Sequence, residues 1–93
     1  MKITFDPVKR DKTLLERALD FADAVEVFSG LHTVLEDDRF DYGETRFISA
    51  GFLRGRMVVI VWTQRGQARH VISMRFCHAR EEARWRKHLE RPG

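Results

Sequence analysis

The hydrophobic positions in the N-terminal part of the chain follow the spacing of one strand and then of a helix. Residues 2–5 (K-I-T-F) alternate polar and apolar side chains, which predicts a short strand. Asp6 and Pro7 predict a helix start, because an Asp side chain accepts hydrogen bonds from free N–H groups and proline needs no N–H donor in the first turn. We expect this helix to cover residues 7–19 and to turn three apolar side chains towards the core: Leu15, Ala18 and Leu19.

A second helix is predicted directly after the first. Asp20 has the residue type of an N-cap, and the apolar residues behind it recur at the spacing of one helical face. The pair Ser29-Gly30 favours the end of this helix. We assign the apolar stripe to the core rather than to a cofactor site: Phe21, Ala24, Val25 and Phe28.

The rest of the chain is predicted to form strands followed by one helix. Strands are expected over residues 33–36, 46–53, 57–63 and 69–75. The third of these (M-V-V-I-V-W-T) is an almost continuous run of apolar, mostly β-branched residues, which is typical of the centre of a sheet. A basic helix is expected over residues 78–89, with acids in its first turn and bases in its last turn, where each charge complements the helix dipole.

The predicted element order is β-α-α-β-β-β-β-α. This order favours an α+β fold in two layers, with a twisted antiparallel sheet and helices packed on one face. The chain has 93 residues, which is enough for one hydrophobic core, and it shows no internal repeat or linker. We therefore expect a single domain over residues 1–93.

Alternation along the strand 69–75 sorts its side chains into two sets. His70, Ile72 and Met74 point one way, and Arg69, Val71, Ser73 and Arg75 point the other way. If Ile72 and Met74 face the core, Arg69, Ser73 and Arg75 line the open side of the sheet. Two guanidinium groups and a hydroxyl suit a phosphate group. The alternative is that these are ordinary solvent-facing residues of a half-exposed sheet.

Charge is distributed unevenly around a formal net charge of +3. Between Asp20 and Glu44 acidic residues outnumber basic ones, and from Arg46 onward basic residues predominate. A basic half favours a partner that carries phosphate groups. Both halves also fit ordinary solvated faces, so charge alone does not decide between these interpretations.

The residues that commonly bind metals or act as nucleophiles show no diagnostic spacing. The four histidines and one cysteine do not match a zinc motif, so neither a metal nor a cofactor is expected. Cys77 is expected to be a small apolar residue between the last strand and the last helix. A lone cysteine suits a reducing cytoplasm. No apolar run is long enough to cross a membrane, and the N-terminus lacks the apolar core of a signal peptide.

Four segments, taken in their order and spacing, resemble a known family. They are F-D-P-V-K (5–9), D-F-A-D-A-V-E-V-F (20–28), R-F-I-S-A-G-F-L with G-R-M-V-V-I-V-W-T (46–63), and H-V-I-S-M-R (70–75) followed by Glu81 and Trp85. The chain thereby resembles the BrnT-type toxins, the toxin half of a bacterial toxin–antitoxin pair with a RelE-like fold. The resemblance implies a ribonuclease that cuts RNA and arrests translation.

The resemblance also implies partners and site residues. A ribbon-helix-helix antitoxin (BrnA-like) would neutralise the toxin, and operator DNA would be bound only through the toxin–antitoxin complex. The positions that match the family are Lys9, Arg46, Ser73, Arg75, Glu81 and Trp85. Two positions depart from it. Glu16-Arg17-Ala18 stands where family members often have Lys-His-Gly, and Trp85 stands where the family usually has Tyr.

Metal-independent RNA cleavage needs a base at the 2′-OH, an acid at the leaving oxygen and cations around the phosphate. Arg75 and Arg69 supply cations in this interpretation, and Ser73 donates a positioning hydrogen bond. Glu81 and His78 are the candidates for proton transfer, while alternation places His70 on the other face. For RNA contacts we expect four residues: Lys9, Arg46, Arg69 and Trp85. We expect Trp85 chiefly to pack against the core and otherwise to stack on a base.

Two other functions are kept as alternatives. The first is a catalytically weak binding module that pairs with the antitoxin and acts mainly in repression of its own operon. Arg17 motivates it, because a guanidinium stays protonated and cannot replace a proton-transferring histidine. The second is a free-standing structural domain with no affinity for a partner or for phosphate.

Overall fold

The computed structural model describes residues 1–89. The helical elements are α1 (Pro7–Arg17), the 3-10 turn η1 (Phe21–Asp23), α2 (Ala24–Ser29) and α3 (Ala79–Leu89). The strands are β1 (Lys2–Phe5), β2 (Leu35–Asp37), β3 (Arg46–Leu53), β4 (Arg56–Arg65) and β5 (Ala68–Phe76). The expected α+β class and element order are confirmed.

The five strands form one sheet in the order β1-β5-β4-β3-β2. The apolar strand β4 lies at the centre, as its composition predicts. β2, β3, β4 and β5 pair antiparallel, but β1 pairs parallel with β5, so the sheet is mixed. The expectation of a wholly antiparallel sheet was wrong at this edge. No hairpin joins β1 to β5, and the direction of β1 is therefore not set by a turn.

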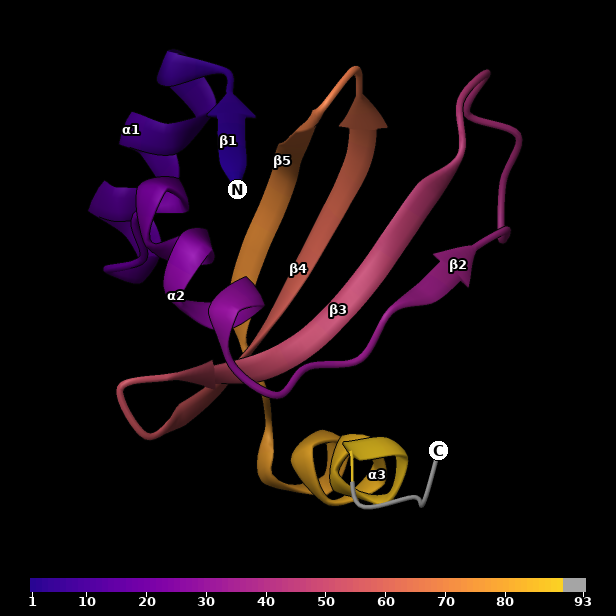
Figure 1. Ribbon diagram of the computed structural model, residues 1–93. Helices are drawn as coiled ribbons and strands as arrows, with labels where there is room; N and C mark the ends of the chain where they lie inside the picture. Colours follow the sequence, from indigo (N-terminus) through magenta and orange to yellow (C-terminus); the bar gives the residue numbers. More distant parts are fainter. Residues whose placement is uncertain (90–93) are drawn as a thin grey trace.

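The helices do not all cover one face of the sheet. Side chains of β4 on one face pack against η1 and α2: Val58, Ile60 and Trp62 with Phe21, Ala24, Val27 and Phe28. On the other face, Met57 and Val59 pack against α3 through Trp85 and Leu89. Successive strand residues point to opposite faces, so α3 lies across the sheet from α2. Figure 1 shows α3 well separated from α1 and α2.

Helix α1 begins as predicted but is shorter and more exposed. The Asp6 carboxylate accepts a hydrogen bond from the Val8 N–H, at 2.9 Å. The helix ends at Arg17, because Ala18 adopts a left-handed conformation with φ of 57°. Leu15 is 88 % exposed, so the expectation that it faces the core was wrong. Leu19 is buried as predicted.

Polar contacts hold α1 in place, since none of its own residues is buried. Arg10 donates through Nε and Nη2 to both carboxylate oxygens of Asp20, at 2.9 and 2.7 Å. Arg17 donates through Nη1 to the Met74 carbonyl, at 3.0 Å. The two ends of the helix are thus tied to η1 and to β5.

The second helical segment keeps its predicted cap but changes its buried face. The Asp20 carboxylate accepts a hydrogen bond from the Ala22 N–H, at 2.9 Å, and begins the 3-10 turn η1. This turn alters the helical phase, so Val27 is fully buried and Val25 is half exposed. Assigning Val25 to the core was therefore wrong. Gly30 ends α2 as expected.

The short strand predicted over 33–36 is displaced along the chain. β2 covers Leu35–Asp37. Thr33 lies before this strand and forms hydrogen bonds with Ala50 of β3. The buried Thr33 hydroxyl accepts from the Ala50 N–H at 2.9 Å, and the Thr33 N–H donates to the Ala50 carbonyl at 3.0 Å. These bonds satisfy backbone groups of β3 ahead of β2, beside an isolated antiparallel bridge between His32 and Gly51.

A β-bulge in β5 determines which of its side chains share a face. Val61 of β4 lies opposite Ser73, whereas the next residue, Trp62, lies opposite Val71. Ile72 is therefore an extra residue on β5. Such an insertion shifts the alternation of the strand by one position.

The bulge overturns part of the predicted sorting of β5. Val71 and Met74 are three residues apart, yet both are buried in the core shared with α2. Arg69 accordingly lies on the α2 face, and His70 lies on the opposite face. Their predicted positions were wrong because strict alternation leaves no room for an inserted residue. The positions of Ser73 and Arg75 are confirmed.

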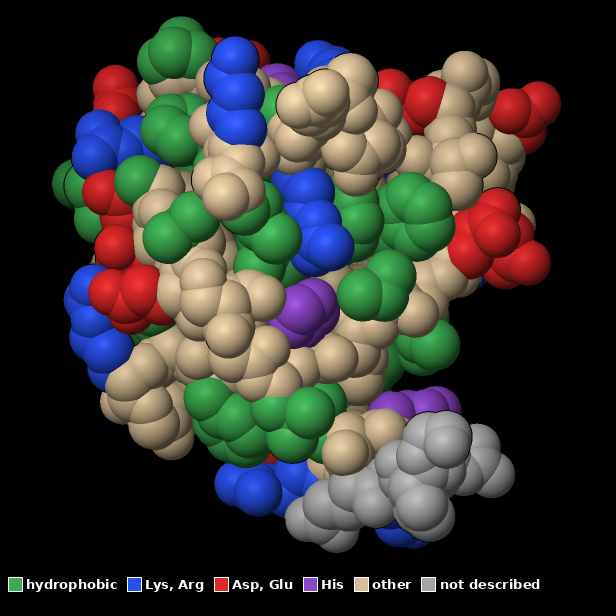
Figure 2. Space-filling view, in the orientation of Figure 1, with side chains coloured by type: hydrophobic (Ala, Val, Ile, Leu, Met, Phe, Trp, Pro, Cys, Tyr) green, Lys and Arg blue, Asp and Glu red, His purple; other side chains and the backbone are tan. Residues whose placement is uncertain are grey.

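The surface view shows how charge is segregated. Acidic side chains gather over the loop between β2 and β3 (Figure 2). The sequence places several acids there: Asp38, Asp41 and Glu44. Within residues 1–89, no helix has the length and apolar character needed to span a membrane.

Candidate active site on the open face of the sheet

We call the face that carries Val59 and Val61 the open face, because α3 covers only one end of it. A hollow of about 350 Å³ lies on this face. Ser73 and Arg75 enter it from β5, and Glu81 and Trp85 enter it from α3. Its floor is formed by Ile48, Val59 and Val61. The structure thus brings together four residues that the sequence singled out.

Arg75 and Glu81 form a bidentate ion pair. The Nη1 and Nη2 groups of Arg75 donate to the two oxygens of Glu81, at 2.7 and 2.6 Å. The guanidinium holds the pKa of Glu81 down at about 2. Glu81 is therefore charged at neutral pH and is a poor proton donor. Two of the five N–H donors of Arg75 are used, and three are left for another acceptor.

His78 lies beside this pair at the start of α3. It lines an adjoining hollow with Arg75 and Glu81, together with two further arginines of the helix: Arg80 and Arg84. The hollow has a volume of about 520 Å³. Histidine is the residue type that most often transfers protons in enzymes. His78 is consequently a candidate proton-transfer group that lines the same hollow as Arg75.

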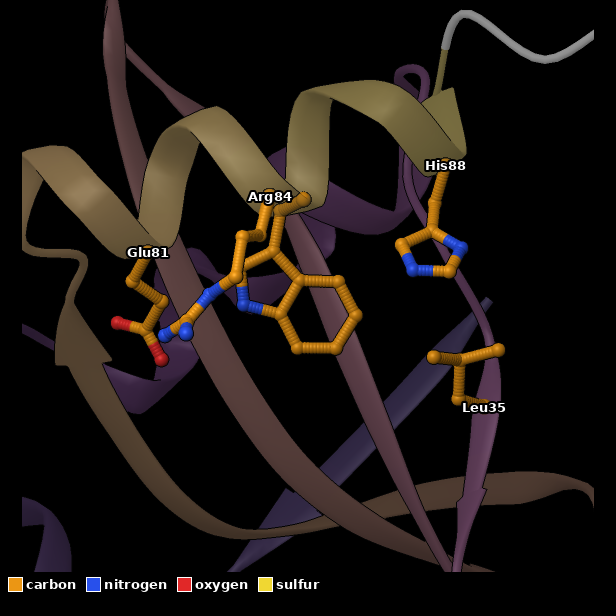
Figure 3. Close-up of a pocket in the computed structure, with 5 residues that line it drawn as sticks. Leu35, Glu81, Arg84 and His88 are labelled. Atoms are coloured by element: carbon orange, nitrogen blue, oxygen red, sulfur yellow. The ribbon is translucent and has the colours of Figure 1, made fainter.

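The helix α3 turns several chemically useful side chains towards the sheet. Figure 3 shows Glu81, Arg84 and His88 extending from the same side of the helix, with Leu35 of β2 opposite His88. These residues and Trp85 line a further hollow of about 260 Å³. Trp85 packs against the core beneath α3 and also borders two of the hollows that Glu81 lines. The packing expected of Trp85 is confirmed, and its indole is also in reach of a ligand on the open face.

Lys9 lies in a groove beside α1, which meets the hollow of Arg75 and Trp85 at Ser73. This groove, of about 250 Å³, is bounded by β5 and by residues of α1: Lys9, Lys12, Thr13, Glu16 and Arg17. Ser73 lines both spaces. The basic side of α1 is therefore continuous with the open face.

Arg69 and Arg46 lie away from these residues. The Arg69 guanidinium lies over the rings of Phe28 and Trp62, at 4.6 and 4.3 Å from their centroids. Arg69 therefore belongs to the α2 side of the sheet, where Figure 2 shows hydrophobic and basic side chains mixed. Arg46 lies over the Tyr42 ring at 4.0 Å and pairs with Glu44, so its charge is engaged by the β2–β3 loop.

His70 lies on the open face because of the bulge. Its Nδ1 is 2.9 Å from the Thr4 hydroxyl of β1. Burial lowers the pKa of His70, and the positive charge of Arg65 adds to this effect. The imidazole is therefore neutral at pH 7. Strict alternation placed it on the other side, so sequence reasoning missed this neighbour of Ser73.

Arg39 is a second residue that sequence reasoning missed. It lies in the β2–β3 loop and lines the same hollow as Arg75. Asp37 accepts two hydrogen bonds from its guanidinium, at 2.8 and 3.0 Å. The signal in the sequence was a lone arginine in an acidic loop, which we interpreted only as part of an acidic segment.

Cys77 has no nucleophilic character in this structure. It packs against the cluster that contains Met57 and Val59. Burial and the nearby Glu81 raise the pKa of its thiol to about 12. Cys77 therefore stays protonated at neutral pH, as expected of a small apolar residue at this junction.

Among residues 1–89, no group of three or more histidine, cysteine or acidic side chains is arranged to hold a metal ion.

The comparisons with known proteins identify the family. A search of curated proteins finds no match. A family model described as the ribonuclease toxin BrnT of a type II toxin–antitoxin system matches residues 5–81. This match spans most of the chain, which therefore belongs to the BrnT family of ribonuclease toxins.

Proposed function

We propose that the protein cleaves RNA on the open face, without a metal, by attack of a ribose 2′-OH on the adjacent phosphate. In this reaction the 2′ oxygen bonds to phosphorus and the bond from phosphorus to the 5′ oxygen breaks. One group removes the 2′ proton, and another protonates the leaving oxygen. The observation that supports the proposal is the convergence of Arg75, Ser73 and Glu81 on one hollow beside His78.

Arg75 binds the phosphate in this mechanism. Its free N–H donors stabilise the negative charge that develops on the phosphorane oxygens. Ser73 donates a hydrogen bond to the same phosphate, and the Trp85 indole offers a plane for a base. Lys9 contacts a neighbouring phosphate in the groove beside α1. Because that groove meets the hollow at Ser73, one RNA strand reaches both.

Glu81 and His78 divide the remaining work. Glu81 fixes the orientation of Arg75 and, being ionised, is an acceptor rather than a donor of protons. His78 takes the proton of the 2′-OH as the base, and a water molecule supplies the proton to the leaving 5′ oxygen. Arg69 and Arg46, proposed from the sequence as RNA contacts, are left out because other groups engage them.

A type II toxin has a cognate antitoxin. We propose that this antitoxin is a BrnA-like ribbon-helix-helix protein and that operator DNA is bound only through the complex. The toxin would then meet RNA and antitoxin in the cytoplasm and arrest translation. Support comes from the family assignment together with the lone, protonated cysteine, which suits a reducing compartment.

A catalytically weak binding module is the second candidate. The observation that favours it is the position of Arg17, whose guanidinium contacts β5 next to Ser73. An arginine at that place supplies a cation but no proton transfer. In this case the protein pairs with the antitoxin and acts mainly in repression of its own operon, without cutting RNA.

The first prediction concerns Arg75→Ala. Removing the guanidinium should slow cleavage of RNA by about 10²-fold or more, because one preorganised charge donor is commonly worth that much. The measurement is a timed digest of RNA by purified protein in the presence of a chelator.

His78→Ala should also slow cleavage, by about 10²-fold, because it removes the group proposed to transfer the proton. The same digest measures this effect.

Arg54→Gln is the matched control for this digest. It removes an exposed arginine at the β3–β4 turn that pairs with Asp23 and Glu26 of the α2 side. Its cleavage rate should equal that of the wild type. An inactive wild type that still binds antitoxin tightly would refute the nuclease and support the binding module.

A further inference from the structure

Arg39 reaches the active-site hollow from the side opposite β5. It follows β2 in the loop that leads to β3, yet it lines the same hollow as Ser73 and Arg75. Its side chain is 65 % exposed, so most of its donors are open to a ligand. Two guanidinium groups from different segments therefore border one space.

Hydrogen bonds to a buried carboxylate hold the Arg39 guanidinium in place. Asp37, whose side chain is 1 % exposed, accepts from Nε and Nη2 of Arg39 at 2.8 and 3.0 Å. The Tyr42 hydroxyl donates to the same carboxylate at 3.2 Å. The Arg39 guanidinium is the main reason that the pKa of Asp37 falls to about 2. A buried carboxylate bound at both oxygens fixes the direction of its partner.

Arg39 and Arg75 are both positively charged and lie close enough to repel each other. The positive charge of Arg39 lowers the pKa of Arg75, although the ion pair with Glu81 outweighs this effect. Asp37 pairs with Arg39, and Glu81 pairs with Arg75, so each guanidinium has a carboxylate partner of its own. The floor between the arginines is apolar: Ile48, Val59 and Val61. Each guanidinium keeps N–H donors that its own carboxylate does not use, and such donors beside an apolar floor suit the oxygens of a phosphate group.

We propose that Arg39 is a second phosphate-binding residue of the active site and that Asp37 positions it. The RNA backbone is then held between the β2–β3 loop and β5, with Arg75 on the reacting phosphate and Arg39 on that phosphate or its neighbour. This inference rests on the proposed function of the open face. It adds a contact that the sequence pattern did not indicate.

The test uses a single-stranded RNA whose 2′ oxygens are methylated, which binds but cannot be cleaved. Affinity is measured by fluorescence anisotropy over a range of salt concentrations. Arg39→Gln should weaken binding by about tenfold, the effect of one charged contact, and reduce the salt slope by about 0.7, the value for one phosphate on a single strand. Arg54→Gln should change neither quantity.

Positioning by Asp37 is tested with three further variants: Asp37→Asn, the double variant, and Arg39→Lys. Arg39→Gln keeps an amide donor for the buried carboxylate, and the double variant Asp37→Asn with Arg39→Gln leaves no unpaired charge. Asp37→Asn should weaken RNA binding while Arg39 is present and should have no further effect once Arg39 is glutamine. Arg39→Lys should recover part of the affinity and the salt slope, which a loss of folding would not allow.

The outcomes separate this inference from the proposed function. If Arg75→Ala weakens binding and Arg39→Gln matches the wild type in affinity and salt slope, the role of Arg39 is refuted and the open face stands. If the wild type binds no RNA, both fall together. Additive effects of the Asp37 and Arg39 variants would show that Asp37 does not act through Arg39.

Discussion

The carboxylate of Glu81 connects α3 to Arg75, near the end of β5. Both of its oxygens accept from Arg75, and its side chain is 18 % exposed. The pair orients the guanidinium towards the hollow and keeps Glu81 ionised. The same bond therefore contributes to folding and prepares the site, and both effects depend on the ionisation of Glu81.

The pKa of Glu81 gives a prediction about stability. Its pKa is about 2 in the folded protein and 4.5 ordinarily. The ion pair therefore stabilises the fold above about pH 4.5, and this contribution is lost as pH falls towards 2. Glu81→Gln should lower the free energy of unfolding at pH 7 by on the order of 1–2 kcal/mol, a value reduced for the half-exposed Arg75. Urea unfolding measures it.

The difference between wild type and Glu81→Gln should vanish near pH 2. Glu82→Gln is the control, because Glu82 forms only an exposed pair with Arg86, four residues on, at 3.4 Å. Such a pair contributes about 0.3–0.5 kcal/mol. A difference for Glu81→Gln that stays constant from pH 7 to pH 2 would contradict the assignment.

Among the elements, α2 and β3 approach each other unusually closely at Gly51. A Cβ at this position would lie 2.8 Å from Cγ1 of the fully buried Val27 and 3.0 Å from Cβ of His32. Neither atom is the free end of a flexible side chain. The absence of a side chain at Gly51 is thus what allows α2 and the following segment to pack on the sheet.

Gly51→Ala should accordingly destabilise the fold. Overpacking a well-filled core costs about 1–3 kcal/mol. Gly30→Ala is the matched control: its Cβ would lie 3.9 Å from the nearest atoms, and the change should stay within about 0.5 kcal/mol. Thermal unfolding of the two variants compares them. Equal stability of Gly51→Ala and the wild type would contradict the packing described.

The elements also show what local sequence determines. Asp6 and Asp20 mark their helix starts correctly, since a cap depends on a few adjacent residues. The bulge at Ile72 depends on pairing with β4, so the facing of Arg69 and His70 could not be read from β5 alone. Leu15 has helical spacing, but polar ends rather than an apolar face hold α1.

The candidate site could likewise be predicted where its residues lie on regular strands and helices, but not where they lie in a loop. Ser73, Arg75, Glu81 and Trp85 lie on elements whose faces follow from short-range patterns, and these residues do converge. Arg39 comes from a loop, and its place follows from the buried partner Asp37. A pairing of this kind depends on the path of the loop, which residue periodicity does not describe.

At the scale of the whole molecule, the sheet presents two chemically different faces. The α2 face is occupied by the core and by Arg69, which lies over aromatic rings. The open face carries the paired Arg75, with Arg39 and the basic side of α1 around it. We therefore propose that RNA is cleaved on the open face only, although both faces carry an arginine of the same strand.

A single-turnover comparison of Arg75→Lys and Arg69→Lys in RNA cleavage tests this claim most directly. Both substitutions keep the charge and remove the guanidinium fork. Arg75→Lys should slow cleavage by at least about tenfold, because lysine lacks the bidentate geometry that suits phosphate. Arg69→Lys should cleave at a rate within about twofold of the wild type, since Arg69 lies over Phe28 and Trp62 on the α2 face and the substitution leaves the open face unchanged. An Arg75→Lys protein of full activity, with an Arg69→Lys protein that is impaired, would contradict the account.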